Sequence, residues 1–71
     1  MKTEAPMFEP IAANLRLQRQ DRGLSQAQLA RRAGISSTTM RKAEDGRHSH
    51  HRATLAKIAR ALDVDVQTLL R

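Results

Sequence analysis

Cysteine, tryptophan and tyrosine are absent from this 71-residue chain, and phenylalanine occurs once, at Phe8. Without cysteine no disulfide can brace the fold, and no thiolate can bind a metal. A chain of this length forms one domain, whose small core rarely contributes more than about 3–5 kcal/mol. Close helix packing or a partner subunit must therefore supply the stability.

Long apolar runs are also missing, and apolar and polar residues do not alternate along the chain. No stretch approaches the roughly 20 apolar residues of a membrane span, and the first ten residues lack the apolar segment of a secretion signal. The lack of cysteine fits a reducing cytoplasm. We therefore expect a cytoplasmic protein without a membrane partner. The apolar residues are mostly alanine, leucine and isoleucine, which favour helix over sheet.

Positive charge is in excess, with 13 lysines and arginines against seven acidic residues and a formal net charge of +6. Such a balance indicates nucleic acid, an anionic membrane or an acidic protein as partner. A basic charge that only maintains solubility explains the composition equally well. Charge alone therefore leaves the class of partner open.

The apolar spacing predicts an all-α, compact five-helix domain over residues 11–71, preceded by a flexible arm over residues 1–10. Pro6 and Pro10 oppose helix in the arm, and Pro10 suits a first helical turn. Ser25, Ser36 and Asp65 are expected helix caps, with Gln28 completing a capping box at Ser25. The expected helices cover residues 11–22, 25–34, 36–45 and 52–62, and a last short helix follows Asp65.

The buried positions follow from the same spacing, because residues three and four apart share a helix face. None of these helices is long enough to be stable alone, so their apolar faces must pack together. We expect the following residues to point inward: Ile11, Leu15, Ala27, Leu29, Ala30, Ala33, Met40, Ala43, Leu55, Ile58, Ala59, Leu62, Val66, Leu69 and Leu70.

The stretch from Leu24 to Gly46 has the form of a helix-turn-helix, two short helices joined by a turn that contains glycine. Small residues at Ala30 and Ala33 permit close approach, and Gly34 lets the chain reverse. The second helix then keeps an outer side that fits the DNA major groove and carries hydrogen-bond donors. These donors are Ser37, Thr38, Arg41 and Lys42.

A family likeness runs through most of the chain. Its residues are Ile11, Leu15, Arg19, "GLSQ" at 23–26, Leu29, Ala30, Gly34, Ile35, Ser36, Glu44, Gly46, "TL" at 54–55, Lys57, "ALDV" at 61–64 and "LL" at 69–70. In these residues the chain resembles the Cro/repressor-type (XRE-like) helix-turn-helix family, which includes the lambdoid phage repressors. The resemblance implies a lambda repressor-like fold and sequence-specific binding of double-stranded DNA. It also implies a bacterial or phage transcription regulator, in the first place a repressor, that is nucleoid-associated. Relatives usually bind as homodimers on half-sites about 34 Å apart.

The resemblance also assigns roles to matching positions. Residues 36–45 form the recognition helix, in which Ser37, Thr38, Arg41 and Lys42 contact bases. Arg19 and Glu44 form a structural ion pair, while Gln26, Ser36 and Arg47 contact phosphates.

The chain departs from the family pattern at three positions. Ala43 stands where relatives carry a large apolar residue, and His50 stands in place of a usual proline. Asp45 places a carboxylate beside the expected phosphate contact, where a negative charge is unfavourable. These departures concern local geometry near the end of the recognition helix.

Other functions find little support in the sequence. The spacing of His48, His50 and His51 matches no recognised zinc motif, so we expect no metal, although their protonation would add charge below about pH 6.5. There is no nucleophile paired with a base, no glycine-rich phosphate loop and no carboxylate pair. We expect no enzyme activity, no cofactor and no small-molecule ligand.

Three other interpretations stay open. The first is a protein-interaction module of the same fold, with an antitoxin- or excisionase-like partner. The second is a non-specific DNA binder, and the third is a piece of a longer regulator.

Overall fold

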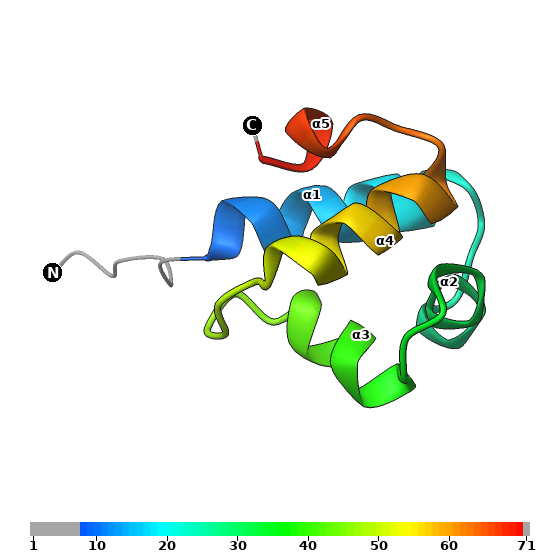
Figure 1. Cartoon of the computed structure of the whole chain (residues 1–71), viewed down its shortest axis with the longest axis horizontal. Coiled ribbons are helices and arrows are strands. Elements are labelled where there is room, and N and C mark those ends of the chain that lie inside the picture. Colours follow the sequence, from blue (N-terminus) through cyan, green and yellow to red (C-terminus); the bar gives the residue numbers. More distant parts are fainter. Residues whose placement is uncertain (1–7, 71) are drawn as a thin grey trace, which may run out of the picture.

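The chain folds into five short helices in the computed structural model, which describes residues 8–70 (Figure 1). Within this range there is no strand, which confirms the all-α prediction. Residues 1–7 of the predicted flexible arm lie outside the described residues. The helices are α1 (Glu9–Asp21), α2 (Gln26–Ala33), α3 (Ser37–Ala43), α4 (Arg52–Leu62) and α5 (Val66–Leu70).

The helices surround one small core to which each of them contributes. Helix α2 contacts α3 and α4, while α5 contacts α1 and α4. In Figure 1, α3 lies along the lower edge and α5 along the upper edge, with α1 and α4 between them. Since no helix of this length is stable alone, the shared core makes folding of each helix depend on the others. The largest fully buried side chains are Leu15, Leu29, Met40, Ile58, Leu62 and Leu69.

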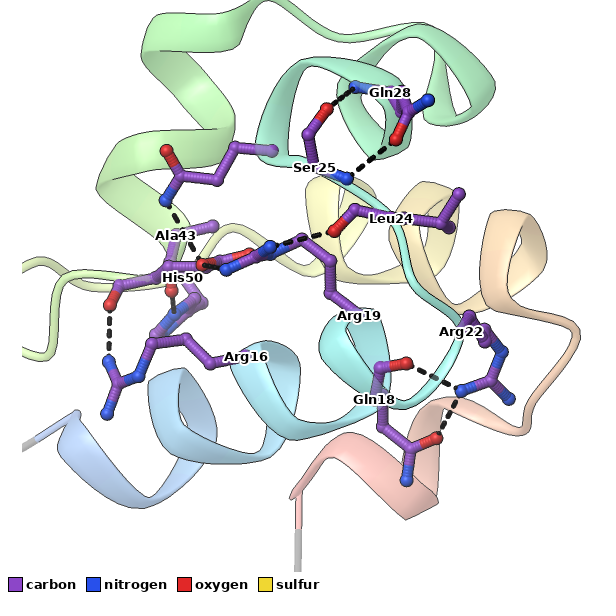
Figure 2. A network of polar contacts seen from close by, with 11 residues as sticks. Arg16, Gln18, Arg19, Arg22, Leu24, Ser25, Gln28, Ala43 and His50 are labelled. Atoms are coloured by element: carbon purple, nitrogen blue, oxygen red, sulfur yellow. Dashed lines mark hydrogen bonds and ion pairs between the residues drawn. The ribbon is translucent and has the colours of Figure 1, made fainter.

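Side-chain caps fix the helix starts around the turn between α2 and α3. The Ser25 hydroxyl accepts from the Gln28 N–H at 3.0 Å, and the Ser25 N–H donates to Gln28 Oε1 at 2.8 Å (Figure 2). The Ser36 hydroxyl accepts from the Thr39 N–H at 3.0 Å. Between these caps, Gly34 ends α2 with a φ of 72°, a left-handed conformation that glycine adopts without strain. The predicted capping box and turn are confirmed.

Two predicted helix boundaries were wrong. Helix α1 begins at Glu9 rather than at residue 11, because Pro10 lies within its first turn, where its missing N–H has no cost. Helix α3 ends at Ala43 rather than at residue 45. The chain must turn there so that Gly46 can pack against the start of α1.

Gly46 is needed for this close approach and has no positive φ. The Phe8 N–H donates to the Gly46 carbonyl at 3.0 Å. A Cβ built on Gly46 would lie 2.7 Å from the Glu9 Cα, closer than real Cβ contacts allow. Glu9 also forms an ion pair with Arg16, two turns further along α1. The start of α1 is thus joined to the chain that follows α3.

Two residues predicted to point inward are exposed. Ala27 lies on the outer side of α2, since that helix turns Leu29 and Ala30 toward the core. Leu70 is 43% exposed, whereas its neighbour Leu69 is fully buried. Successive residues of a helix point in directions about 100° apart, so α5 presents only one of the two leucines to the core.

A buried ion pair joins α1 to the end of α3. Arg19 Nε lies 2.6 Å from Glu44 Oε2, and Arg19 Nη2 lies 3.0 Å from Glu44 Oε1 (Figure 2). The Glu44 side chain is 2% exposed and the Arg19 side chain 13%. Arg19 Nη1 also donates to the Leu24 carbonyl at 2.8 Å, and Gln26 Nε2 donates to Glu44 Oε1 at 3.1 Å. The carboxylate therefore has three donors, as a buried charge requires.

The backbone carbonyls at the end of α3 have donors as well. Arg16 Nη1 donates to the Glu44 carbonyl at 2.6 Å. His50 Nε2 lies 2.6 Å from the Ala43 carbonyl, which fixes that ring nitrogen as the donor, and the ring meets Phe8 edge-on. The last carbonyls of a helix lack partners inside the helix, so these side chains complete the end of α3.

We expect Arg19→Ala to lower the free energy of unfolding by about 3 kcal/mol, because Glu44 would keep a buried charge without its bidentate partner. For a domain of this size the melting temperature should fall on the order of 15 °C. Thermal unfolding followed by circular dichroism measures the change. Arg22→Ala is the matched control, since Arg22 is exposed and, among the described residues, its side chain bonds only to Gln18, one turn earlier. Equal melting of Arg19→Ala and the native chain would contradict a structural role for the pair.

Candidate nucleic-acid interface

The outer face of α3 carries polar side chains that face solvent. Ser37, Thr38, Arg41 and Lys42 are all exposed, while Met40 and Ala43 of the same helix are buried. The spacing explains the division, because positions one helical turn apart lie on one side. Within residues 8–70, none of the four exposed side chains makes a hydrogen bond or an ion pair. The structure therefore brings together the four residues predicted to contact bases.

A shallow hollow of about 260 Å³ lies on this face. Thr38, Arg41 and Lys42 line it together with Asp45. Thr38, Arg41 and Lys42 can each donate hydrogen bonds to a partner, and Arg41 and Lys42 carry positive charge at neutral pH. The surface suits an anionic or acceptor-rich partner, except at the Asp45 carboxylate.

The three residues predicted to contact phosphates lie at the ends of helices or beyond them, and each has an intramolecular bond. Gln26 stands in the first turn of α2 and donates one amide hydrogen to Glu44, which leaves its second hydrogen available. The Ser36 hydroxyl caps α3 and donates to Thr39 Oγ1 at 2.9 Å. Arg47 follows α3 and pairs with Asp45. The last of these contacts was not anticipated from the sequence.

The Asp45–Arg47 pair is bidentate. Arg47 Nε lies 3.0 Å from Asp45 Oδ1, Arg47 Nη2 lies 3.0 Å from Oδ2, and the Arg47 backbone N–H also donates to Oδ1 at 3.1 Å. The side-chain hydrogen bond from Arg47, followed by its backbone N–H, lowers the pKa of Asp45 to about 2. The same carboxylate raises the pKa of Arg47. Both groups therefore stay charged at any pH well above about 2. The sequence did contain a sign of this contact, because Arg47 follows Asp45 by two residues, which is the spacing of an Asx turn.

The three histidines of the loop after α3 lie among different groups. His50 turns inward to the Ala43 carbonyl, and its Nδ1 is buried without a hydrogen-bond partner. His48 Nε2 lies 3.6 Å from Asp45 Oδ2, and His51 is the residue before α4. Among the described residues, no group of three or more side chains is arranged to hold a metal ion. Sequence reasoning missed the role of His50, whose ring bonds to the Ala43 carbonyl and contacts Phe8.

A second hollow of about 350 Å³ borders the loop, between α3 and the start of α4. Lys42, His48 and His51 line it together with Thr39 and Thr54, so polar side chains continue from α3 toward α4. No helix in the part of the chain that the structure describes is long and apolar enough to cross a membrane.

Comparison with known proteins identifies the family. The family model described as "Helix-turn-helix domain" matches residues 10–71. No curated protein sequence matches the chain. A hypothetical transcription factor from Neisseria is 32% identical and superimposes with a TM-score of 0.83, covering 99% of this chain and 83% of its own. The restriction-modification controller protein C.AhdI from Aeromonas hydrophila is 29% identical, with a TM-score of 0.83 over 87% of this chain and 94% of its own.

A larger relative has the same fold in part of its length. An HTH_3 family transcriptional regulator from Vibrio cholerae is 33% identical, with a TM-score of 0.83 over 90% of this chain. The alignment spans 36% of that regulator, so this chain corresponds to about a third of it. The match of the family model and the shared fold lead to one conclusion: the chain belongs to the helix-turn-helix domain family, within the XRE-like group of DNA-binding transcriptional regulators.

Proposed function

We propose that the protein binds double-stranded DNA sequence-specifically and regulates transcription, with α3 in the major groove. One observation carries the proposal: four donor side chains that have no partner within residues 8–70 share the outer face of a helix whose two ends are held by the fold. An α-helix fits the width of the major groove, where base edges present acceptors in a distinct pattern for each base pair. The surface thus has the shape and the chemistry for reading sequence.

The side chains divide into two groups by position. Arg41 and Lys42 lie in the last turn of α3 and suit guanine, while Ser37 and Thr38 contact bases near the start of that helix. Gln26, Ser36 and Arg47 flank this face, and we assign them to phosphates. Contacts of the first group set sequence preference, and contacts of the second fix the helix in the groove.

Repression is the simplest regulatory outcome, because it requires only that the domain occupy its site on DNA. We propose that the protein acts in the cytoplasm at the nucleoid, without enzyme activity, cofactor or small-molecule ligand in this domain. A DNA-bound regulator needs none of these, and no residue of the proposed interface is paired as a nucleophile with a base.

Enrichment from random duplex DNA at about 0.15 M salt, followed by sequencing, tests the proposal. We expect a defined motif, because directed donors discriminate between base pairs. Binding that weakens steeply with salt but enriches no motif would identify a non-specific binder. A chain that binds no duplex even at low salt would be a protein-interaction module instead.

We expect Lys42→Ala to weaken binding to the enriched sequence and to relax preference at one position of the motif. A good base contact contributes about 1–3 kcal/mol of discrimination, which corresponds to roughly 5–150-fold between the right and the wrong base. Affinities for the motif and for single-position variants, measured at constant salt, give the result. Arg60→Ala removes one charge at the far end of α4 and is the control. Equal weakening on all sequences would make Lys42 a phosphate contact only.

We further propose a homodimer that uses the side of the molecule opposite α3. Leu70 is 43% exposed there and borders a hollow of about 220 Å³ with Phe8, Ile11 and Leu55. In Figure 1, α5 lies on the edge opposite α3, so a partner on α5 leaves the proposed DNA face open. Two-fold dimers of helix-turn-helix proteins bind half-sites about one helical turn apart.

Sedimentation at high protein concentration, with and without the enriched duplex, checks the dimer. We expect a species of twice the 8.0 kDa chain mass, which Leu70→Gln should abolish by removing apolar contact area. Leu17→Gln is the matched control, since Leu17 is 62% exposed and does not border the hollow. A single 8.0 kDa species under both conditions would contradict the proposal.

A further inference from the structure

Asp45 places a negative charge on the face proposed to meet DNA. Its side chain borders the same hollow as Thr38, Arg41 and Lys42. A carboxylate near a phosphate backbone repels it, so the residue lowers affinity unless it has another effect. The structure shows such an effect, because the Asp45 carboxylate binds Arg47, the cationic residue that follows α3.

Arg47 is bound by Asp45 yet remains open to solvent. Its side chain is 77% exposed, whereas that of Asp45 is 28% exposed. The pair uses Nε and Nη2 of the guanidinium, so Nη1 keeps its hydrogens for another acceptor. While the pair persists, the positive charge of Arg47 is largely offset and contributes little to attraction at a distance.

The pair is easily exchanged by a competing anion. The pair is bidentate, but both partners reach solvent, so a phosphate can approach the guanidinium and accept the same kind of hydrogen bonds as the carboxylate. A phosphate held at the right place can therefore replace Asp45 on Arg47. Protonation does not release it near neutral pH, since Arg47 holds the pKa of Asp45 at about 2. His48, 3.6 Å from Oδ2, is a second cation for the carboxylate when it is protonated.

The position of a phosphate differs between two kinds of complex. When α3 makes its base contacts, the backbone lies at a fixed distance from the residues beyond the helix. In non-specific complexes the protein slides and is held mainly by charge, so no phosphate is fixed where it would displace Asp45 from Arg47. The Asp45–Arg47 pair would then persist, and its carboxylate would weaken that complex.

We propose that Asp45 is a specificity-determining residue, which holds Arg47 in an intramolecular ion pair and releases it only to the phosphate beside a correctly seated α3. The inference rests on the proposed DNA-binding function. By this arrangement Asp45 weakens non-specific binding more than specific binding. It raises the ratio of the two affinities without contacting a base.

The test compares Asp45→Asn with the native chain on the enriched duplex and on a random duplex, each at several salt concentrations. We expect affinity for random duplex to rise roughly tenfold and affinity for the enriched duplex only about two- to threefold, since Arg47 is freed mainly in the former. The salt dependence on random duplex should steepen by about one phosphate contact, a change of about 0.9 in slope.

Two further variants separate the causes. Asp63→Asn makes the same change in net charge at the end of α4, where asparagine accepts the left-handed backbone of that residue, and should leave the affinity ratio unchanged. In an Arg47→Ala background, Asp45→Asn should no longer steepen the salt dependence. Urea unfolding of each variant establishes that the fold is retained.

Three results would overturn the inference. The first is an unchanged affinity ratio in Asp45→Asn while the native chain binds both duplexes. The second is weaker binding by Asp45→Asn, which would make the carboxylate a support that aims Arg47 at phosphate. The third is a native chain that binds no duplex at low salt, which would overturn the proposed function and this inference with it.

Discussion

The ion pair between Arg19 and Glu44 is the constraint on which the rest of the structure depends. Helix α3 has seven residues, too few to be stable alone, and it must still present its outer face in a fixed direction. One end is fixed by the Ser36 cap and the buried Met40. The other end is fixed by Glu44, which connects it to α1 by two hydrogen bonds of 2.6 and 3.0 Å. Without this anchor, the end of α3 would keep the bonds of Arg16 and His50 to its carbonyls but lose its buried side-chain connection to α1.

The buried Glu44 carboxylate also connects helices that an apolar residue at this position could not join by hydrogen bonds. Replacing an ion pair by apolar side chains is often neutral for stability, so stability alone does not account for it. Here the same carboxylate accepts from Gln26 of α2, and its Arg19 partner donates to the Leu24 carbonyl in the turn before α2. One charged group thus fixes α1, α2 and α3 relative to one another. Those are the helices that set the distance between the proposed phosphate contacts and the proposed base contacts.

Features governed by neighbours in sequence could be predicted well. The capping box at Ser25, the Ser36 cap and the whole of α4 follow from residues three and four apart, and the structure has them as predicted. The outward direction of Arg41 and Lys42 follows from the same helical period. Errors arose where distant segments meet. The end of α3 depends on the fit of Gly46 against Glu9, a contact across most of the domain that no local pattern contains.

The partners of individual side chains were harder to predict than the faces on which they lie. The sequence places Gln26 and Arg47 beside the expected DNA surface, but their bonds to Glu44 and Asp45 depend on side-chain conformations. The same holds for His50, whose bond to the Ala43 carbonyl could not be read from its position in a polar loop. Periodicity predicts which way a residue points, whereas a hydrogen bond requires atoms placed to within a few tenths of an ångström.

The division of polar groups across α3 gives a physical reason for the sequence-specific DNA binding proposed above. At its ends, the donors and acceptors are satisfied within the protein, by Ser36, Arg19 and Arg16. Along its outer face the donors of Arg41 and Lys42 are exposed and have no protein partner among the described residues. A wrong base would displace solvent from these donors without replacing its hydrogen bonds, which costs more than a right base gains. The rigid ends matter because a helix free to tilt would find other acceptors on a wrong sequence. The free-energy cost of the unpaired donors, which disfavours that sequence, would then be lost. Selectivity therefore depends on satisfied polar groups at the ends of α3 as much as on unsatisfied ones along its face.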